Sequence, residues 1–138
     1  MRLELVLIPV TDVDRALAFY VEKAGFNLDV DHRVSDEFRV VQMTPPGSAC
    51  SITIGIGMTD AVPGSVRGTH LVVSDIEAAR AELVDRGVDV TEIRHFESGT
   101  WTPGPDPERR RYNSFADFCD PDGNTWVLQE ARRADPIA

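Results

Sequence analysis

Cysteine is scarce in this sequence, and neither cysteine lies in a spacing that binds metal or forms a redox pair. The 138 residues contain only Cys50 and Cys119, with no CxxC or CxH pattern around them. Proteins of reducing compartments use cysteine in this way, as a small apolar side chain. We therefore predict a cytoplasmic protein in which both thiols are reduced, buried and inert.

Long apolar runs and an excess of positive charge are also missing. The longest apolar stretch near the N-terminus, Leu5 to Val10, has six residues, whereas a membrane-spanning helix needs about 20. It follows Met1 and Arg2 directly, so we expect no signal peptide. Fourteen basic residues stand against 23 acidic ones, for a formal net charge of -9. Because phosphate binding needs a positive surface, we expect neither a nucleic-acid nor a membrane partner.

Motifs for nucleotide binding and for triad catalysis are absent from the sequence. It contains no P-loop, no GxGxxG and no Ser-His-Asp order, and we expect no cofactor. Hydrophobic residues make up 42% of the chain, which is enough for a globular core. The length suits one domain, which we place over residues 1–138.

An internal repeat organises the chain. When the sequence is shifted by 63 residues, Val10–Lys23 aligns with Val73–Arg86, and five of the 14 aligned pairs are identical. Five further pairs are conservative, and with one gap Gly25 meets Gly87. The chain therefore contains a duplicated unit.

Each copy carries the same local signals for a strand followed by a helix. An apolar run, Leu3–Val10 in the first copy and Thr69–Val73 in the second, predicts a strand. The patterns Thr11-x-x-Asp14 and Ser74-x-x-Glu77 then resemble capping boxes, which begin a helix. Apolar residues follow at helical spacing in both copies.

Gly25 and Gly87 fit the left-handed position that ends a helix, and strands follow each of them. We place the later strands at Phe26–Arg33, Phe38–Met43, Ala49–Ile56, Val88–Phe96, Ser114–Cys119 and Thr125–Glu130. Glu97–Arg111 has no periodicity, and we interpret it as a long mobile loop that serves as a lid or binding segment.

These elements predict an α+β fold of two tandem βαβββ modules. Module 1 covers about residues 1–58 and module 2 about residues 66–131. We expect them to form a cup-shaped mixed sheet with the helices on its outer face.

The pattern resembles the vicinal oxygen chelate superfamily, which contains glyoxalases, bleomycin-resistance proteins and extradiol dioxygenases. The resemblance covers residues 3–130 and rests on Asp12, Phe19-Tyr20, Asp75, Gly87 and Asp120–Asn124. It implies the cup-shaped fold, and it implies a homodimer because family members usually pair. It does not choose a chemistry, because one fold hosts many functions.

In the metal-dependent members of this superfamily, four strand positions supply the ligands, usually His and Glu. Carried onto this chain, those positions are Leu5, Ile52, Gly68 and Val127. None has a side chain that binds a divalent cation. The resemblance therefore implies a cup without the usual metal site.

Strand alternation predicts which side chains face the cup. Leu5 and Leu7 share one face, as do Gly68 and His70, whereas Leu71 and Trp126 would pack on the helices. His70 is the candidate for ligand contact or for acid/base catalysis, because imidazole exchanges protons near neutral pH. The candidate ligand-binding residues are Leu5, Leu7, Ile52, His70, Trp101, Phe118, Val127 and Gln129.

Other residues admit two interpretations each. Trp101 would cap a ligand in the cup or pack on its own domain or a neighbouring subunit. Arg109–Arg111 would receive an anion or remain solvated, and we expect the solvated state. We also expect His32 and His95 to be solvated, because their strands are rich in charge.

Three functions remain open. The first is a metal-free small-molecule-binding protein in the manner of the bleomycin-resistance proteins. The second is an enzyme of the same superfamily: a glyoxalase-like lyase, or a metal-independent catalyst using His70. The third is an interaction module whose cup is filled by its own side chains, and an open cavity with His70 exposed would favour the first two.

Overall fold

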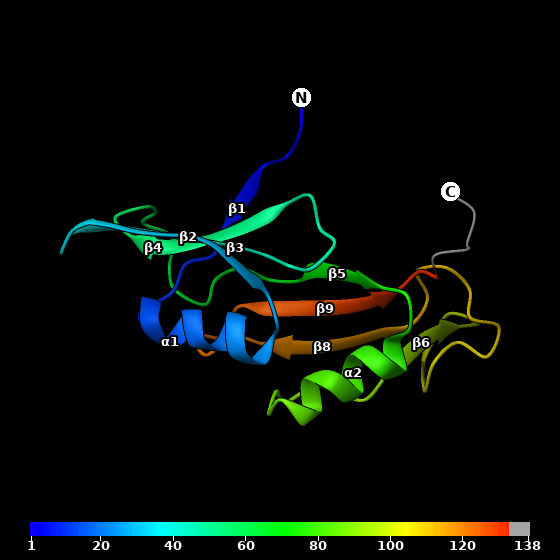
Figure 1. Cartoon of the computed structure of the whole chain (residues 1–138). Helices are drawn as coiled ribbons and strands as arrows, with labels where there is room; N and C mark the ends of the chain where they lie inside the picture. Colours follow the sequence, from blue (N-terminus) through cyan, green and yellow to red (C-terminus); the bar gives the residue numbers. More distant parts are fainter. Residues whose placement is uncertain (133–138) are drawn as a thin grey trace. The chain divides into compact units, whose positions relative to one another are not determined.

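A computed structural model describes residues 1–132 of the chain (Figure 1). The chain divides into two compact units. Unit 1 comprises Met1–Arg67 and Cys119–Asn124. Unit 2 comprises Gly68–Phe118 and Thr125–Ala138, of which residues 133–138 lie outside the described part. Both sheets are mixed and each unit carries one helical segment, so the α+β prediction is confirmed.

Unit 1 contains a four-stranded sheet in the order β1-β4-β3-β2. The central strands pair antiparallel, and β1 joins β4 in parallel. Helix α1 (Val13–Ala18) continues into a π-helical turn, η1 (Phe19–Lys23). The strands are β1 (Leu5–Leu7), β2 (Asn27–Ser35), β3 (Phe38–Thr44) and β4 (Ser51–Ile56).

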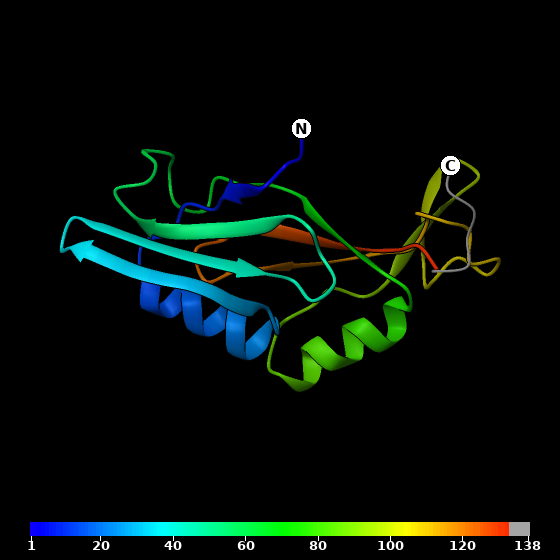
Figure 2. The same cartoon turned by 45° about the horizontal axis from the view of Figure 1, so that its top comes forward.

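Unit 2 contains a five-stranded sheet in the order β5-β9-β8-β6-β7. Here β5 joins β9 in parallel, as β1 joins β4 in unit 1. Helix α2 (Ile76–Asp85) follows β5 (Figure 2). The strands are β5 (Thr69–Val73), β6 (Arg94–Glu97), β7 (Thr100–Pro103), β8 (Phe115–Cys119) and β9 (Thr125–Glu130). The repeat is therefore confirmed, with β7 as an addition in the second copy.

Both helices begin one residue later than the sequence predicted. Asp12 and Asp75, not Thr11 and Ser74, have the extended backbone of the first cap position. Their carboxylates accept from the backbone N–H three residues on, at 3.1 Å in both copies. Among residues 1–132, no helix is long and apolar enough to cross a membrane.

The core of unit 1 lies between its sheet and helix α1. The buried residues of β3 alternate with more exposed ones, and Val41 faces Ile54 of β4 across the strand pair. Arg39 lies on that same face and is only 7% exposed. Its guanidinium bonds Asp14 on α1 at 2.8 Å and Asp31 on β2 at 2.9–3.0 Å. This pairing lowers the pKa of the Asp31 carboxyl and fixes the helix to the sheet.

A second buried polar group of unit 1 is centred on Asp120. One of its carboxyl oxygens accepts from the Tyr20 hydroxyl and the Asn124 amide, both at 2.8 Å. The other accepts the backbone N–H groups of Asp122 and Asn124 at 2.9 and 3.0 Å. Asn124 also donates to the carbonyl oxygen of Pro9 at 2.9 Å. Every donor in this group therefore has a partner, as buried polar groups require.

Two predictions about local structure are wrong. The strand expected at Val88–Phe96 begins only at Arg94, because Thr91 bonds β8 partly through its hydroxyl and not by a regular ladder. The cysteines are also more accessible than expected. Both are free thiols, Cys50 half-buried and Cys119 exposed.

Candidate functional site

The sheet of unit 2 has one face that packs with α2 and one face opposite the helix, here called the open face. The β5–β9 register sets His70 beside Val127 and Val72 beside Gln129. The other face carries Trp126 and Leu128, which are 1% and 2% exposed. The alternation predicted for β5 and β9 is therefore confirmed, and it brings His70, Val127 and Gln129 onto one surface.

Strand β8 extends the open face. The backbone N–H of Glu130 donates to the carbonyl oxygen of Ser114 at 3.0 Å. In an antiparallel pair this register sets Phe115 beside Gln129 on the open face. Phe118 therefore points the other way, where its ring stacks on Trp126 with centroids 6.1 Å apart. The prediction that Phe118 shares the ligand face is wrong, because hairpin register was not fixed by sequence.

Three aromatic rings and one guanidinium gather on the open face of β6, β7 and β8. We call Phe96, Trp101, Phe115 and Arg94 the aromatic shelf. The Trp101 ring lies edge-on to Phe96 and to Phe115, with centroids 5.2 and 5.3 Å apart. The Arg94 guanidinium lies 5.0 Å from the Trp101 ring centroid and 5.7 Å from that of Phe115. Ring edges and a cation on ring faces are both favourable geometries, so the shelf is preorganised.

The aromatic shelf is held from one side and exposed on the other. Arg94 forms a two-pronged ion pair with Asp117, at 2.8 and 3.3 Å. Trp101 remains 52% exposed and Phe96 45% exposed. Large aromatic rings left in water at ordered positions are typical of binding surfaces.

The segment that carries Trp101 is a hairpin, which corrects the expectation of a long loop as far as Pro103, whereas residues 104–111 contain no helix or strand. Strands β6 and β7 pair from Arg94–Pro103 to Glu97–Thr100. Ser98 and Gly99 between them have φ of 50° and 78°. Positive φ at both turn residues defines the tight type I′ hairpin, whose twist suits paired strands. The sequence did not predict this hairpin because its two short strands lack apolar alternation. Such strands can still pair when a two-residue turn joins them.

His70 is exposed on the open face, as the sequence predicted. Its Nδ1 lies 2.6 Å from the carbonyl oxygen of Gly68, so this nitrogen carries the hydrogen. The tautomer therefore leaves Nε2 as an acceptor. Within the described residues, His70 is available to a ligand that offers a donor.

The candidates in unit 1 divide between the two faces of its sheet. Leu5 and Leu7 lie beside Ser51 and Thr53 in the parallel register, away from Ile52. Ile52 pairs with Met43 on the helix-packed face and is 3% exposed. The prediction that Ile52 shares a face with Leu5 is therefore wrong. The residue beside Leu5 is Ser51, and successive side chains of a strand point to opposite faces of the sheet.

The residues at the family's metal positions do not fit a divalent cation. Leu5 and Val127 offer no donor atom, and Gly68 has φ of 74°, where a ligating side chain would be strained. Within residues 1–132, no group of three or more His, Cys, Asp or Glu side chains is placed to hold a metal.

Arg110 is exposed as expected, whereas Arg109 and Arg111 are half-buried, and the arginine run makes contacts that its sequence did not predict. Arg109 is paired with Glu77 and with the buried Glu130, and Arg110 with Asp106 and Glu108. Arg111 lies over the ring of Tyr112, with 4.7 Å to the centroid. The acidic partners of Arg109 and Arg110 leave this segment unsuited to an incoming anion.

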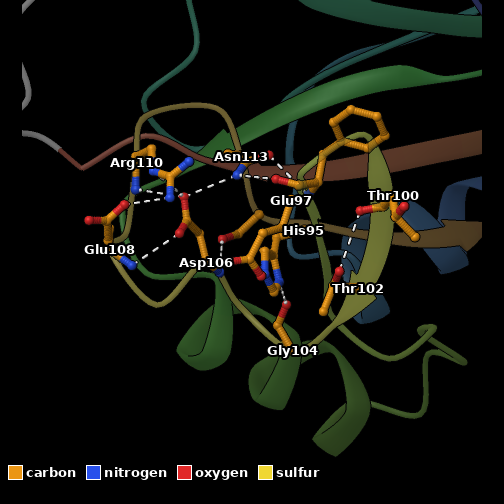
Figure 3. A network of polar contacts seen from close by, with 11 residues as sticks. His95, Glu97, Thr100, Thr102, Gly104, Asp106, Glu108, Arg110 and Asn113 are labelled. Carbon is orange, nitrogen blue, oxygen red and sulfur yellow. Dashed lines mark hydrogen bonds and ion pairs between the residues drawn. The ribbon is translucent and has the colours of Figure 1, made fainter.

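His95 is also not solvated. It is 3% exposed and both ring nitrogens are hydrogen-bonded (Figure 3). His32, in contrast, is exposed on β2 as predicted. The sequence around His95 gave no sign of burial, because its partner Gly104 lies nine residues away in an aperiodic segment.

These features define a tandem-module α+β protein with an aromatic open face. The chain belongs to the Glyoxalase/Bleomycin resistance protein/Dioxygenase superfamily, because the model of that family matches residues 2–128. It is similar to the crystal structure of TnmS3, an antibiotic binding protein from Streptomyces sp. CB03234. The two chains are 32% identical, the alignment covers 94% of this chain and 95% of TnmS3, and the TM-score is 0.72.

Two other similarities agree with this assignment. A member of the same superfamily from Sphaerobacter thermophilus DSM 20745 is 29% identical over 95% of this chain and 98% of its own, with a TM-score of 0.73. The uncharacterized protein YetH of Bacillus subtilis (strain 168) is 25% identical over 127 residues, which are 91% of this chain and 94% of YetH.

Proposed function

We propose that this protein binds a small molecule containing an aromatic ring, without a metal, and sequesters it in the cytoplasm. The observation that carries the proposal is the aromatic shelf, where Trp101 is ordered by three neighbours and is still 52% exposed. A flat apolar ligand would cover the exposed rings, and that burial is favourable at about 25 cal/mol per Å².

The surroundings of the shelf give such a ligand polar contacts. Gln129 lies beside Phe115, and its amide donates to the carbonyl oxygen of Tyr112 at 3.1 Å, which leaves its own oxygen as an acceptor. His70 and Val127 continue the surface across β9 and β5. A few polar groups at the border of an apolar surface are the usual composition of a small-molecule site. The similarity to an antibiotic binding protein supports the same class of ligand.

Metal-independent binding is tested by metal removal. We expect the protein purified without chelator to carry no near-stoichiometric Zn, Ni, Fe or Mn, because the family's metal positions hold Leu5, Gly68 and Val127. Elemental analysis measures this. A fluorescence titration with Nile red, an apolar aromatic dye, should then give the same affinity before and after dialysis against EDTA. Bound metal that resists dialysis, or binding lost with EDTA, would contradict the proposal.

A metal-independent enzyme is the second candidate, and His70 favours it. Its Nε2 is an acceptor on the open face, in the position of a general base for a bound ligand. Prolonged incubation with a bound aromatic compound separates the two candidates. A binding protein would return the compound chemically unchanged, whereas an enzyme would return a product.

We also propose a homodimer. Unit 1 leaves apolar side chains exposed on its sheet, among them Leu7 and Val30, and a second copy that covered them would remove this surface from water. Sedimentation equilibrium over a range of concentrations should give twice 15.2 kDa. A mass of 15.2 kDa that persists at high concentration would refute it.

A further inference from the structure

The hairpin that carries Trp101 is bonded on its other face by His95. Nδ1 of this histidine lies 2.7 Å from the carbonyl oxygen of Gly104, just beyond β7. Its Nε2 lies 3.1 Å from a carboxylate oxygen of Glu97, in the last position of β6 (Figure 3). We call His95, Glu97 and Gly104 the His95 bridge. It ties the first strand of the hairpin to the segment that leaves the second.

Both partners of this histidine are acceptors. A carbonyl oxygen and an ionised carboxylate cannot donate, and neutral imidazole has only one N–H. The two hydrogen bonds are therefore made together only by the protonated ring. Loss of that proton leaves one nitrogen lone pair facing an oxygen lone pair, in a site where His95 is 3% exposed.

The segment after the His95 bridge is connected to the aromatic shelf. Asp106, fully buried, accepts the backbone N–H groups of Glu108 and Arg110 and the side-chain amide of Asn113 (Figure 3). Asn113 in turn bonds both the N–H and the carbonyl oxygen of Phe96, at 3.1 and 3.0 Å. Gly104 is therefore two residues from Asp106, which bonds Asn113, and Asn113 in turn bonds the backbone of Phe96 in the aromatic shelf.

The charges around His95 favour its protonated form. The hydrogen bond to the Gly104 carbonyl, and then that to Glu97, raise the pKa of His95, with the charges of Glu97 and Asp106 adding to this against the cost of burial. Arg110 is a cation of the same network and is paired with Asp106 and Glu108. On the side of α2, the cavity beside Gly104 is lined by the charged residues Glu77, Arg80 and Glu92.

We propose that protonation of His95 orders the β6–β7 hairpin and so couples ligand binding on the aromatic shelf to pH. This inference has two halves. The hairpin half, that protonation orders the β6–β7 hairpin, stands on the His95 bridge alone. The ligand half, that binding depends on pH, also rests on the proposed function. Because the folded-state pKa lies above that of the unfolded chain, the stabilisation is complete below the ordinary histidine pKa of about 6.5 and is lost as pH rises through the raised value. Binding is therefore strongest on the acidic side of this transition.

The hairpin half is tested without any ligand. The chain has two tryptophans, so 5-fluorotryptophan labelling gives two ¹⁹F resonances, which Trp101→Phe assigns. Between pH 5 and 9 the Trp101 resonance should shift in the wild type and in His32→Gln, whose histidine is exposed on β2. It should stay constant in His95→Gln, because glutamine does not titrate.

Glu97→Gln is the second variant, and it keeps an acceptor at an accessible position while removing the charge. Its transition should move to lower pH by about half a unit or more. A Trp101 resonance that is insensitive to pH, or one whose transition is unchanged in both variants, would overturn the inference.

The ligand half uses Nile red, which is neutral over this range. Its affinity should fall about threefold or more across the same transition in the wild type and not in His95→Gln. Binding with a pH-independent affinity overturns the coupling. No binding at any pH, with the Trp101 transition intact, overturns the proposed function and leaves the link between His95 and the hairpin supported.

Discussion

Trp101→Ala is expected to weaken binding of an aromatic ligand by about 2–4 kcal/mol, which is roughly 30- to 1000-fold. The reason is that Trp101 contacts every other member of the aromatic shelf, so its removal deletes the largest ring and exposes the sides of Phe96 and Phe115. Folding should change by less than about 1 kcal/mol, because half of this side chain is already in water.

The matched control is Phe38→Ala, which removes an exposed aromatic ring from unit 1. It should leave the affinity unchanged. His70→Ala should fall between the two, with a loss of about 1–2 kcal/mol for one polar contact. Calorimetric or fluorescence titration of the three variants with the same aromatic ligand decides the order. Equal affinities for wild type and Trp101→Ala would remove the shelf from the binding site.

Asp120→Ala is expected to lower the free energy of unfolding by about 3–5 kcal/mol, with a fall in melting temperature of more than about 10 °C. The carboxyl group accepts four hydrogen bonds in a buried position. Alanine removes an acceptor of the Tyr20 hydroxyl and one of the two acceptors of the Asn124 amide, and a buried hydrogen bond lost in this way costs about 1–3 kcal/mol.

Two variants make that measurement specific. Asp120→Asn keeps an acceptor oxygen in place and should lose clearly less stability than alanine. Asp36→Ala removes a fully exposed carboxylate, whose contact with Arg33 is 3.9 Å long, and should change stability by less than about 0.5 kcal/mol. Urea unfolding of the series checks the ranking, and similar losses in Asp36→Ala and Asp120→Ala would contradict it.

The repeat and most strands could be predicted because their signals are local. Apolar alternation and the duplicated Asp-containing helix start act over a few residues, and β5 and β9 lie at the expected bounds. The side-chain direction of His70 and Val127 followed from alternation within single strands. The helix starts were displaced by one residue because Thr11 and Asp12 both suit a cap, and only the backbone angle separates them.

The remaining errors share a physical cause, which is dependence on pairing at a distance. The face of Phe118 depends on the β8–β9 register, and that of Ile52 on its pairing with Met43. The burial of His95 depends on Gly104 in a segment without periodicity. Local propensity carries no information about such partners, so sequence patterns identified the open face but not all of its members.

Strand β7 has no counterpart in the sheet of unit 1 as described, although the two sheets otherwise repeat the same order of elements. It is joined by a two-residue turn and lies at the sheet's edge, so its sequence can vary without disturbing the duplicated framework. Trp101 is on this added strand. The added strand is thus a natural unit for exchange between homologues, and under the proposed function its replacement would change ligand preference while the duplicated scaffold stays constant.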